Sequence, residues 1–485
     1  MAKVSLIYPR DMNLNFFPLG VGYIASFLKN SGHSVKLLDV REEEISQLSI
    51  LKGDPPDIVG FSITTPQVPV ASKMIEYVRK LLPSTYIVVG NIHPAYFKET
   101  YMRESNVDFI VLGEGEVTMC ELCDAIDGKK HFSEIRDLIY CKDGKVIVNP
   151  PRPLIDDLDA LPFPFREGVN YETYLQPPGL IRGLYTRRCA NLTTSRGCPG
   201  QCNYCGVNFL FEKKYRRRSV ENVLAEIDEL VDRYKIDSIY FMDDTFLMNS
   251  RWILDFCEKL QNHPYRLVWS CYGRVDTVKK EMLLAAKKAG CVQVEYGIES
   301  CSNKTLKRMG KHVRVDQIKD TIQMTKDAGL RALGSFMVGF PEENEEDILD
   351  SMRCSSGLAL DFVTCYFTTP YPGSDLYEQA IQEHRIIESD FSKWYVRNTN
   401  IWRVNLSIGT LEQYRAKFLK QHRLRNISFF LKKPIYVMNI LMLFLRNIKA
   451  IYQASKDSFR TRSWDDFGFY FYVYMTSGQG GRNRT

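Results

Sequence analysis

Asn191-Leu-Thr-Thr-Ser-Arg-Gly-Cys198-Pro-Gly-Gln-Cys202-Asn-Tyr-Cys205 places three cysteines on a loop, directly after an apolar run that predicts a strand over residues 191–194. Thiolates are soft ligands that suit iron-sulfur clusters, and full ligation of a four-iron cluster normally takes four cysteines. Three residues separate Cys198 from Cys202, and two separate Cys202 from Cys205. These three cysteines can ligate three irons of one cluster, so the fourth iron would have no protein ligand. The motif predicts a [4Fe-4S] cluster with one open coordination site.

A structural zinc site is the alternative interpretation of these cysteines. Zinc favours paired spacings and four protein ligands, and no second CxxC or HxxxH follows the motif nearby. The spacing therefore favours the cluster, with Cys198, Cys202 and Cys205 as its metal ligands. We expect the other ten cysteines to be thiols, most of them buried as small hydrophobic side chains.

Strand and helix patterns alternate on both sides of this motif, which predicts an α/β protein with parallel sheets. After the motif the alternation recurs about six times within residues 191–385, which favours a partial (β/α)6 barrel. Five short apolar runs within residues 1–149 predict a Rossmann-like, doubly wound domain. Prolines favour extended chain in a linker over residues 150–190, and residues 386–485 predict a mainly helical, basic and aromatic region, which includes the run 467–472.

Composition limits the class of protein. With 485 residues, 45% of them hydrophobic and 25% charged, the chain predicts a globular protein of two or three domains. The N-terminal residues lack a signal-peptide pattern, so we expect a cytoplasmic location. Residues 386–485 contain 17 Lys and Arg against 6 Asp and Glu. This excess suggests an acidic partner, a membrane surface or nucleic acid, with a solvated basic surface as the alternative.

The CxxxCxxC motif, with Tyr204 before its last cysteine, resembles that of the radical S-adenosylmethionine superfamily. The resemblance implies that S-adenosylmethionine chelates the open iron and that one electron converts it to a 5′-deoxyadenosyl radical, which abstracts a substrate hydrogen. Later segments of the chain resemble the family in order along the barrel: Phe241–Phe246, Glu295–Ser300 and Phe336–Asn344. In the last of these, Glu342 and Asn344 replace the family's glycine and threonine, so no cofactor contact is expected there.

The resemblance implies contacts to S-adenosylmethionine at six residues: Tyr204, Asp243, Asp244, Arg274, Gly297 and Glu299. The paired aspartates could bind the ammonium of the cofactor, and capping of the following helix is their alternative role. Arg274 could pair with the cofactor carboxylate or be an ordinary surface arginine. Glycine at position 297 would admit close approach of the backbone.

An α/β domain ahead of the barrel resembles the cobalamin-binding domain of one branch of the superfamily, through Pro18–Tyr23, Val89–Pro94 and Leu112–Glu116. Ligands of such sheets bind at the carboxyl ends of the strands. The implied cobalamin contacts are therefore Ser62, Thr64, Thr65, Gly90, His93, Gly113 and Glu114. Helix capping is the alternative for the hydroxyls, and a structural role is the alternative for His93. No histidine has a glycine three residues later, so a DxHxxG loop does not fill the lower axial position of the cobalt.

The resemblance implies a cobalamin-dependent radical enzyme, similar to class B type methylases and to anaerobic magnesium-protoporphyrin ester cyclases. It would catalyse C-methylation, or ring formation or rearrangement, at an unactivated carbon. The expected partners are a small-molecule substrate, large and apolar or anionic, and a one-electron donor such as a flavodoxin or ferredoxin. We expect no nucleic acid partner, and the C-terminal region could make peripheral contact with a membrane. The alternatives are a radical enzyme without cobalamin and an iron-sulfur protein that binds nucleic acid through its basic tail.

Overall fold

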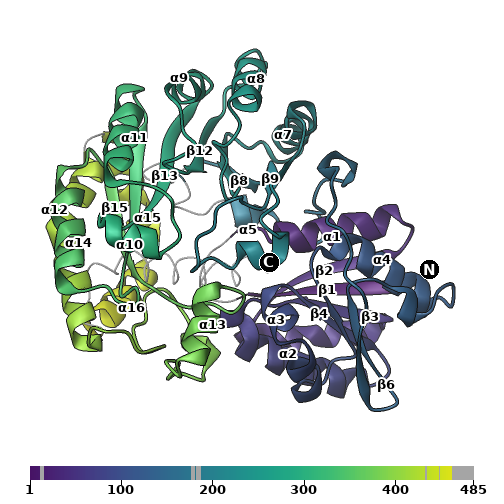
Figure 1. Cartoon of the computed structure of the whole chain (residues 1–485). Helices are drawn as coiled ribbons and strands as arrows, with labels where there is room; N and C mark the ends of the chain where they lie inside the picture. The colour runs from purple at the N-terminus through teal and green to yellow at the C-terminus, as the bar shows by residue number, and fades with distance from the viewer. Residues whose placement is uncertain (11–15, 176–180, 182–186, 432–433, 447, 461–485) are drawn as a thin grey trace.

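The computed structural model describes residues 1–10, 16–175, 181, 187–431, 434–446 and 448–460 (Figure 1). Two sheets, mostly of parallel strands, organise this part of the chain. The first lies at the lower right of Figure 1 and the second at the upper left. The aromatic run 467–472 lies outside the described residues.

Seven strands form the first sheet, in the order β2-β1-β3-β4-β5-β6-β7. Their bounds are β1 Lys3–Arg10, β2 Ser34–Arg41, β3 Ile58–Ser62, β4 Tyr86–Gly90, β5 Phe109–Val111, β6 Leu138–Lys142 and β7 Lys145–Val148. The first five strands are parallel, which confirms the doubly wound arrangement. The sheet is two strands wider than predicted, because an antiparallel hairpin adds to its edge through β6. Asp143 and Gly144 at its turn have φ of 51° and 73°, as a two-residue hairpin turn requires.

Helices cover both faces of this sheet. They are α1 Leu19–Asn30, α2 Val68–Leu81, α3 Ile92–Glu104 and α4 Gly115–Ile126, with 3₁₀ segments η1 Glu42–Gly53, η2 Thr65–Gln67 and η3 Phe132–Glu134. Alternate residues of each central strand enter different apolar clusters: Val88 packs on one face and Val89 on the other. Both faces are thus buried, as expected for a parallel sheet between helices.

The second sheet has six parallel strands in the order β15-β14-β13-β12-β11-β8. Its strands are β8 Cys189–Leu192, β11 Ser238–Phe241, β12 Val268–Gly273, β13 Cys291–Glu299, β14 Arg331–Val338 and β15 Phe362–Phe367. The helices beside it are α7 Val220–Tyr234, α8 Ser250–Gln261, α9 Lys280–Lys288, α10 Asn303–Arg308, α11 Val315–Asp327, α12 Glu345–Gly357 and α13 Asp375–Gln382. The predicted partial barrel is confirmed.

Short elements join the two sheets and follow the first barrel strand. The linker holds η4 Leu158–Ala160 and α5 Glu172–Leu175. A two-stranded ribbon of β9 Ser195–Arg196 and β10 Arg216–Arg217, with α6 Val207–Phe211 between them, encloses the cysteine loop. The cluster motif is therefore held at both ends by backbone pairing.

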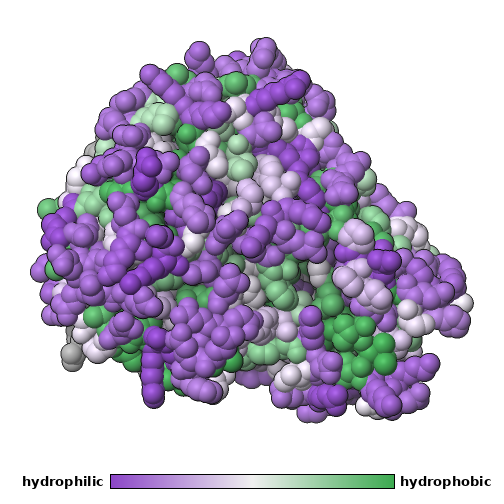
Figure 2. Space-filling model, in the orientation of Figure 1, coloured by the Kyte–Doolittle hydropathy of each residue, from purple (hydrophilic) through white to green (hydrophobic). Residues whose placement is uncertain are grey.

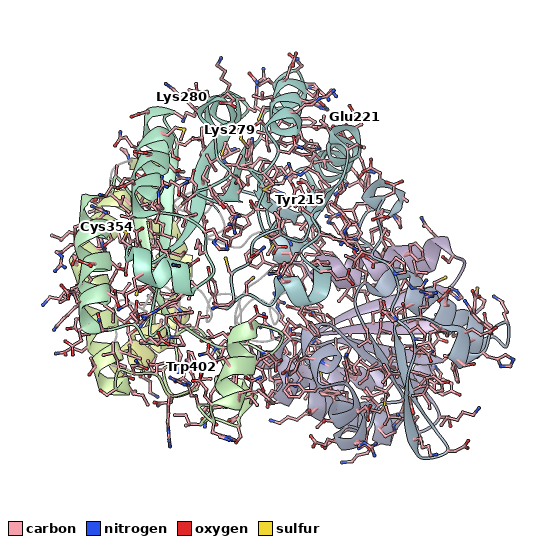
Figure 3. All side chains as sticks on the ribbon, viewed as in Figure 1. Tyr215, Glu221, Lys279, Lys280, Cys354 and Trp402 are labelled. Carbon is pink, nitrogen blue, oxygen red and sulfur yellow. A yellow bond between two sulfur atoms is a disulfide. The ribbon has the colours of Figure 1, made fainter. Side chains whose placement is uncertain are left out.

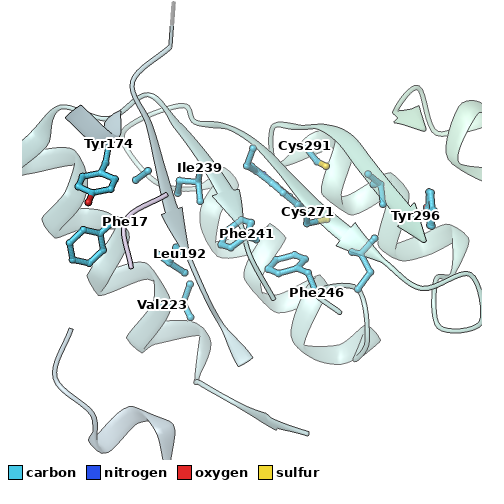
Figure 4. Close-up of a cluster of buried hydrophobic side chains, with 14 of the residues drawn as sticks. Phe17, Tyr174, Leu192, Val223, Ile239, Phe241, Phe246, Cys271, Cys291 and Tyr296 are labelled. Atoms are coloured by element: carbon cyan, nitrogen blue, oxygen red, sulfur yellow. The ribbon is translucent and has the colours of Figure 1, made fainter. Parts of the chain in front are cut away.

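One apolar core continues from the first sheet into the barrel. Phe17, which precedes α1, packs edge to face against Tyr171 and Tyr174 of the linker, with ring centroids 5.4 Å and 5.6 Å away. In Figure 4, Phe17 and Tyr174 lie at one end of the cluster, beside Leu192 and Ile239 of the barrel. The two sheets are thus packed together through buried side chains.

The C-terminal helices are α14 Ile408–Leu431, α15 Pro434–Arg446 and α16 Ile448–Arg460, and η5 Phe391–Lys393 precedes them. Helix α14 lies along β15, where Asn426 accepts a hydrogen bond from the Val363 amide and donates one to its carbonyl. Phe418 of α14 packs against Phe336 of β14. Within the described part of the chain, no helix combines the length and apolar character needed to cross a bilayer.

One pair of cysteines differs from the expectation of thiols. Cys301, just after β13, forms a disulfide with Cys354 of α12, which Figure 3 labels. The fold brings together two residues that are 53 positions apart in the sequence. Cys123, Cys189, Cys257, Cys271, Cys291 and Cys365 are buried thiols, as expected.

Candidate functional site

The cysteine loop lies at the carboxyl end of the barrel sheet. The Cys205 amide donates to the Cys202 carbonyl at 3.2 Å, which turns the loop back on itself. Gly197, just before Cys198, has φ +83°, and a Cβ there would lie 2.1 Å from the Lys214 carbonyl oxygen. Only glycine fits the backbone at the start of this loop.

The donor set suits a cubane cluster. Within the described residues, no group of three or more His, Cys, Asp and Glu side chains is placed to hold one metal ion. In a [4Fe-4S] cluster each thiolate binds a different iron, so the three sulfurs need not meet at one point. The fit rests on three thiols carried by one short loop, of which Cys202 is buried and the others are half-buried.

Asp243 and Asp244 follow β11 but face different partners. Asp243 is buried and accepts hydrogen bonds from the Thr194 amide and hydroxyl and from the Ser195 hydroxyl. Its carboxylate therefore holds the chain that leads from β8 to the cysteine loop. Its predicted role in binding S-adenosylmethionine stays a prediction, beside these hydrogen bonds within the chain.

Asp244 faces the cysteine loop. Partial desolvation and then the charge of Asp243 raise its pKa to about 6, and a hydrogen bond from the Gly197 amide opposes this shift. The side chain itself is exposed. An accessible carboxylate next to the cluster loop can accept hydrogen bonds from an ammonium group.

Arg274, after β12, is held against the cysteines. Its Nε and Nη2 donate to the two oxygens of Asp276 at 3.0 Å and 2.8 Å. This bidentate pair leaves Nη1 at 4.0 Å from the sulfurs of both Cys198 and Cys202. Arg274 is therefore part of the site and not an ordinary surface arginine, and sequence reasoning missed Asp276, which orients it.

A bulge in β13 aims Glu299 toward the same loop. The register with β14 shifts between Gly297 and Glu299, and Glu299 has φ +66°, in the left-handed region that L residues rarely adopt. A Cβ on Gly297 would lie 2.4 Å from Glu299 Oε1, so the carboxylate folds back over the glycine. Burial, and then the charge of Glu299, raise the pKa of Tyr204.

A recess lies at the carboxyl ends of the strands of the first sheet, between β3, β4 and β5 and helices α1 and α4. Its lining is mostly apolar and includes Leu6, Val21, Ile24, Gly60, Ser62, Val88, Gly90, Asn91, Val111, Gly113, Gly115 and Met119. Glycines keep it open, because a Cβ on Gly60 or Gly115 would lie 2.8 Å from a neighbouring side chain. A flat apolar group such as the tail base of cobalamin fits this lining.

Of the predicted cobalamin contacts, Ser62, Gly90 and Gly113 line the recess. Thr64 caps η2 through Gln67, as the alternative interpretation had it. Thr65 lies 3.2 Å from Nδ1 of His93, and both side chains are buried. His93 packs among Phe97, Tyr101 and Phe391, and burial lowers its pKa to about 3. The structure thus places it in an aromatic cluster and not in the recess.

Glu114 also lies away from the recess lining, in a buried ion-pair network between the two sheets. Its oxygens accept from Arg196 and Arg216, each at 2.7 Å, and from the Ile155 amide at 2.7 Å. Arg196 also donates to Glu116 at 2.6 Å. Sequence reasoning missed this network, which fixes the start of α4 against the β9–β10 ribbon.

Asn91 is a further residue of the recess that sequence reasoning missed. Its φ of 80° and ψ of −178° lie in a region that almost only glycine adopts. Its amide nitrogen donates to Ser62 Oγ at 3.0 Å. An asparagine that follows a glycine at a strand end was the available signal, since asparagine tolerates positive φ better than most residues.

Comparison with known proteins gives a family match for the N-terminal sheet domain and another for the barrel. Residues 11–123 match the B12 binding domain family, and residues 192–354 match the radical SAM superfamily. The chain is 33% identical to an uncharacterized methyltransferase of Pyrococcus horikoshii, over 87% of this chain and 90% of that protein. It is 28% identical to the anaerobic magnesium-protoporphyrin IX monomethyl ester cyclase of Rubrivivax gelatinosus, over 78% and 69% of the two chains.

Solved structures share the fold at lower identity. The cobalamin-dependent radical enzyme OxsB, with aqua-cobalamin and S-adenosylmethionine bound, superposes with a TM-score of 0.70 at 18% identity, covering 99% of this chain and 79% of that one. The methyltransferase TsrM of Kitasatospora setae gives a TM-score of 0.66 at 18% identity, with 79% and 75% covered. The chain belongs to the cobalamin-dependent radical S-adenosylmethionine enzymes. Its cofactors are a [4Fe-4S] cluster, S-adenosylmethionine and cobalamin.

Proposed function

We propose that this enzyme transfers a methyl group to an unactivated carbon of a small molecule. The observation that carries the proposal is the match to the Pyrococcus methyltransferase, which extends over 90% of that protein and therefore includes both cofactor-binding units. When bound, the cofactors supply a carbon-centred radical that removes a substrate hydrogen, and a methyl group carried on cobalt.

The residues of this chain would bind and orient those cofactors. Cys198, Cys202 and Cys205 would ligate three irons, and Asp244 would accept hydrogen bonds from the ammonium of S-adenosylmethionine. Arg274, held by Asp276, would meet the carboxylate of that cofactor. The remaining contacts to S-adenosylmethionine are proposed at Tyr204, Gly297 and Glu299. The apolar recess beside Ser62, Gly90 and Gly113 would hold the tail base of cobalamin and exclude water from it.

The unit boundaries follow from the same proposal. Residues 1–149 would bind cobalamin, 150–190 would link the units, 191–385 would carry the radical chemistry, and 386–485 would contact the substrate or a surface. Limited proteolysis tests these boundaries. Cleavage between 150 and 190 that leaves two fragments associated through their shared apolar core would support the linker assignment, and first cleavage elsewhere in the chain would contradict it.

Ring formation or rearrangement is the second candidate. The cyclase of Rubrivivax gelatinosus matches 78% of this chain and is named for ring closure on a porphyrin ester. The net charge of +11 over residues 386–485 would suit a large anionic substrate of that kind.

An anaerobic assay separates the two reactions. The protein is reconstituted with iron, sulfide and hydroxocobalamin and then given reductant and S-adenosylmethionine, with Cys202→Ala as the control. A methyltransferase should form both 5′-deoxyadenosine and S-adenosylhomocysteine, the second only when the corrinoid is present. Deoxyadenosine without S-adenosylhomocysteine would favour the cyclase candidate. Neither product above the control would overturn both.

The electron is proposed to come from a flavodoxin or ferredoxin in the cytoplasm. Reduction of the cluster by either protein, followed through the cluster's visible absorption, tests this partner. Reduction by dithionite but by neither protein would contradict it.

Peripheral contact with an anionic membrane is proposed for α14–α16. In Figure 1, α14 lies at the left edge of the barrel beside α12, and the face of the molecule shown in Figure 2 is mostly hydrophilic. Large apolar side chains are exposed along α14–α16: Leu424, Ile427, Leu431, Met438, Leu441, Leu445, Ile448 and Tyr452. Lys449 and Lys456 are exposed beside them. An apolar face with basic neighbours is typical of interfacial helices. Sedimentation with phosphatidylglycerol vesicles, reduced by Leu431→Ser and Leu445→Ser together, tests the contact, and equal binding to neutral vesicles would contradict the role of charge.

A further inference from the structure

The turn that follows α10 contacts the cysteine loop and, through Lys311, the bulge of β13. Asn203 of the cysteine loop donates its backbone amide to the Met309 carbonyl at 3.0 Å and its side-chain amide to the Arg308 carbonyl at 2.8 Å. Gly310 has φ +63°, and a Cβ there would lie 2.5 Å from the Gln201 carbonyl oxygen. The turn is therefore packed directly against the loop that carries the cluster ligands.

Lys311 extends this contact to the bulge of β13. Its side chain is only 8% exposed, and Nζ donates to the Gly297 carbonyl and to Glu299 Oε1, the latter at 3.2 Å. A Cβ on Gly297 would lie 3.3 Å from this ammonium. A lysine is rarely this buried without an anionic partner, and Glu299 is that partner here.

The ammonium stabilises a backbone conformation that is unfavourable by itself. Glu299 has a left-handed backbone at the bulge, where a residue with a side chain is strained. Lys311 holds both ends of that bulge, since one of its hydrogen bonds goes to the residue before the register shift and the other to the residue after it. The carboxylate is thereby kept over Gly297.

We propose that Lys311 is a positioning residue for S-adenosylmethionine, which fixes the Glu299 carboxylate relative to the cysteine loop. The inference rests on the proposed function, because it takes Glu299 as a cofactor contact. Lys311 acts through Glu299 and through the turn that it ends. Its loss should weaken binding of S-adenosylmethionine and leave the cluster and the corrinoid in place.

The experiment compares four reconstituted full-length variants with wild type: Lys311→Met, Lys311→Arg, the double variant Lys311→Met with Glu299→Gln, and Lys304→Met. Lys304 is the matched control, because it lies on α10 with its side chain 53% exposed. Iron and cobalamin per chain, the thermal midpoint, and the affinity for S-adenosylmethionine by equilibrium dialysis are measured for each. The EPR spectrum of the reduced cluster, with and without S-adenosylmethionine, reports directly whether the open iron is ligated.

We expect Lys311→Met to bind S-adenosylmethionine at least about tenfold more weakly, the loss that removal of a charged hydrogen bond produces. Its iron and cobalamin content should match wild type, and Lys311→Arg should recover part of the affinity. The double variant removes the unpaired buried carboxylate, so its thermal midpoint should recover while its affinity stays low.

Two results would overturn the proposal. One is an affinity for Lys311→Met equal to that of Lys304→Met. The other is a double variant that regains affinity together with stability, since Lys311 would then act only on the fold. Failure of the proposed function has a different signature, because wild type would then bind S-adenosylmethionine but form no S-adenosylhomocysteine in the presence of the corrinoid.

Discussion

Replacing Glu114 with alanine should destabilise the protein before any cofactor binds. The side chain is 5% exposed and pairs with Arg196 and Arg216, which are 15% and 7% exposed. Arg196 would keep Glu116, but Arg216 would keep only the Ile155 carbonyl and the Phe211 ring, 5.6 Å away, and would be left as a buried cation without a counter-ion. Removing one partner of such a buried pair costs about 3–5 kcal/mol.

The assay is urea unfolding of the apoprotein, followed by tryptophan fluorescence and by circular dichroism. Glu221→Ala is the matched control. Glu221 lies at the outer surface on α7 (Figure 3), pairs with Lys259 and is 69% exposed, so its loss should not change unfolding measurably. If Glu114→Ala left the free energy of unfolding unchanged but weakened cobalamin binding, Glu114 would be a cofactor contact, and the reasoning from the ion pairs would be refuted.

Three further predictions concern the loop, the buried charges and the cysteines. Gly310→Ala should lower iron per chain because its Cβ would push on the Gln201 carbonyl, whereas Gly53→Ala, with nothing within 4 Å of its Cβ, should not; equal iron in both would contradict this. Burial raises the pKa of Glu226, but Arg218 and Arg166 overcome this and lower it below its ordinary value. The stability from this carboxylate is therefore complete above about pH 4.3 and is lost as the pH falls through the folded-state pKa. Urea unfolding of Glu226→Gln should depend less on pH in that acid range than wild type, and parallel profiles would count against it. Thiol titration of denatured protein should count 11 groups before reduction and 13 after, and 13 in both would exclude the disulfide between Cys301 and Cys354.

Local patterns were sufficient to predict the strands and most of the helices. Runs such as Ile87–Gly90 are short, apolar and bounded by turn residues, and the fold buries them on both faces. Helix α3 cannot be predicted from a helical pattern, because its backbone breaks at Lys98 with φ 43° and its apolar residues do not follow one helical face. Segment η1 cannot be predicted in this way either, because a 3₁₀ segment lacks the 3.6-residue period on which such predictions depend.

Less of the site could be predicted from the sequence, because its contacts join residues that are far apart in the chain. The cysteine spacing carries its own chemistry, but adjacent carboxylates such as Asp243 and Asp244 point to different sides of an extended chain and cannot be ranked from their identity alone. Glu114 stands in a glycine-rich strand end that suggested a ligand, while its partner Arg216 is 102 residues away. Lys311 belongs to no recognisable motif, and only the fold places its ammonium at Glu299.

The apolar core that passes from Phe17 through Tyr171 and Tyr174 to Leu192 has a practical consequence for protein engineering. A chimaera that exchanged the N-terminal unit for that of a relative, cut anywhere between these residues, would expose aromatic rings on both new surfaces. The donor segment must therefore include both tyrosines of the linker, or the recipient must keep Phe17. Natural exchange of these units between genes would meet the same restriction, so the two units are expected to have diverged together.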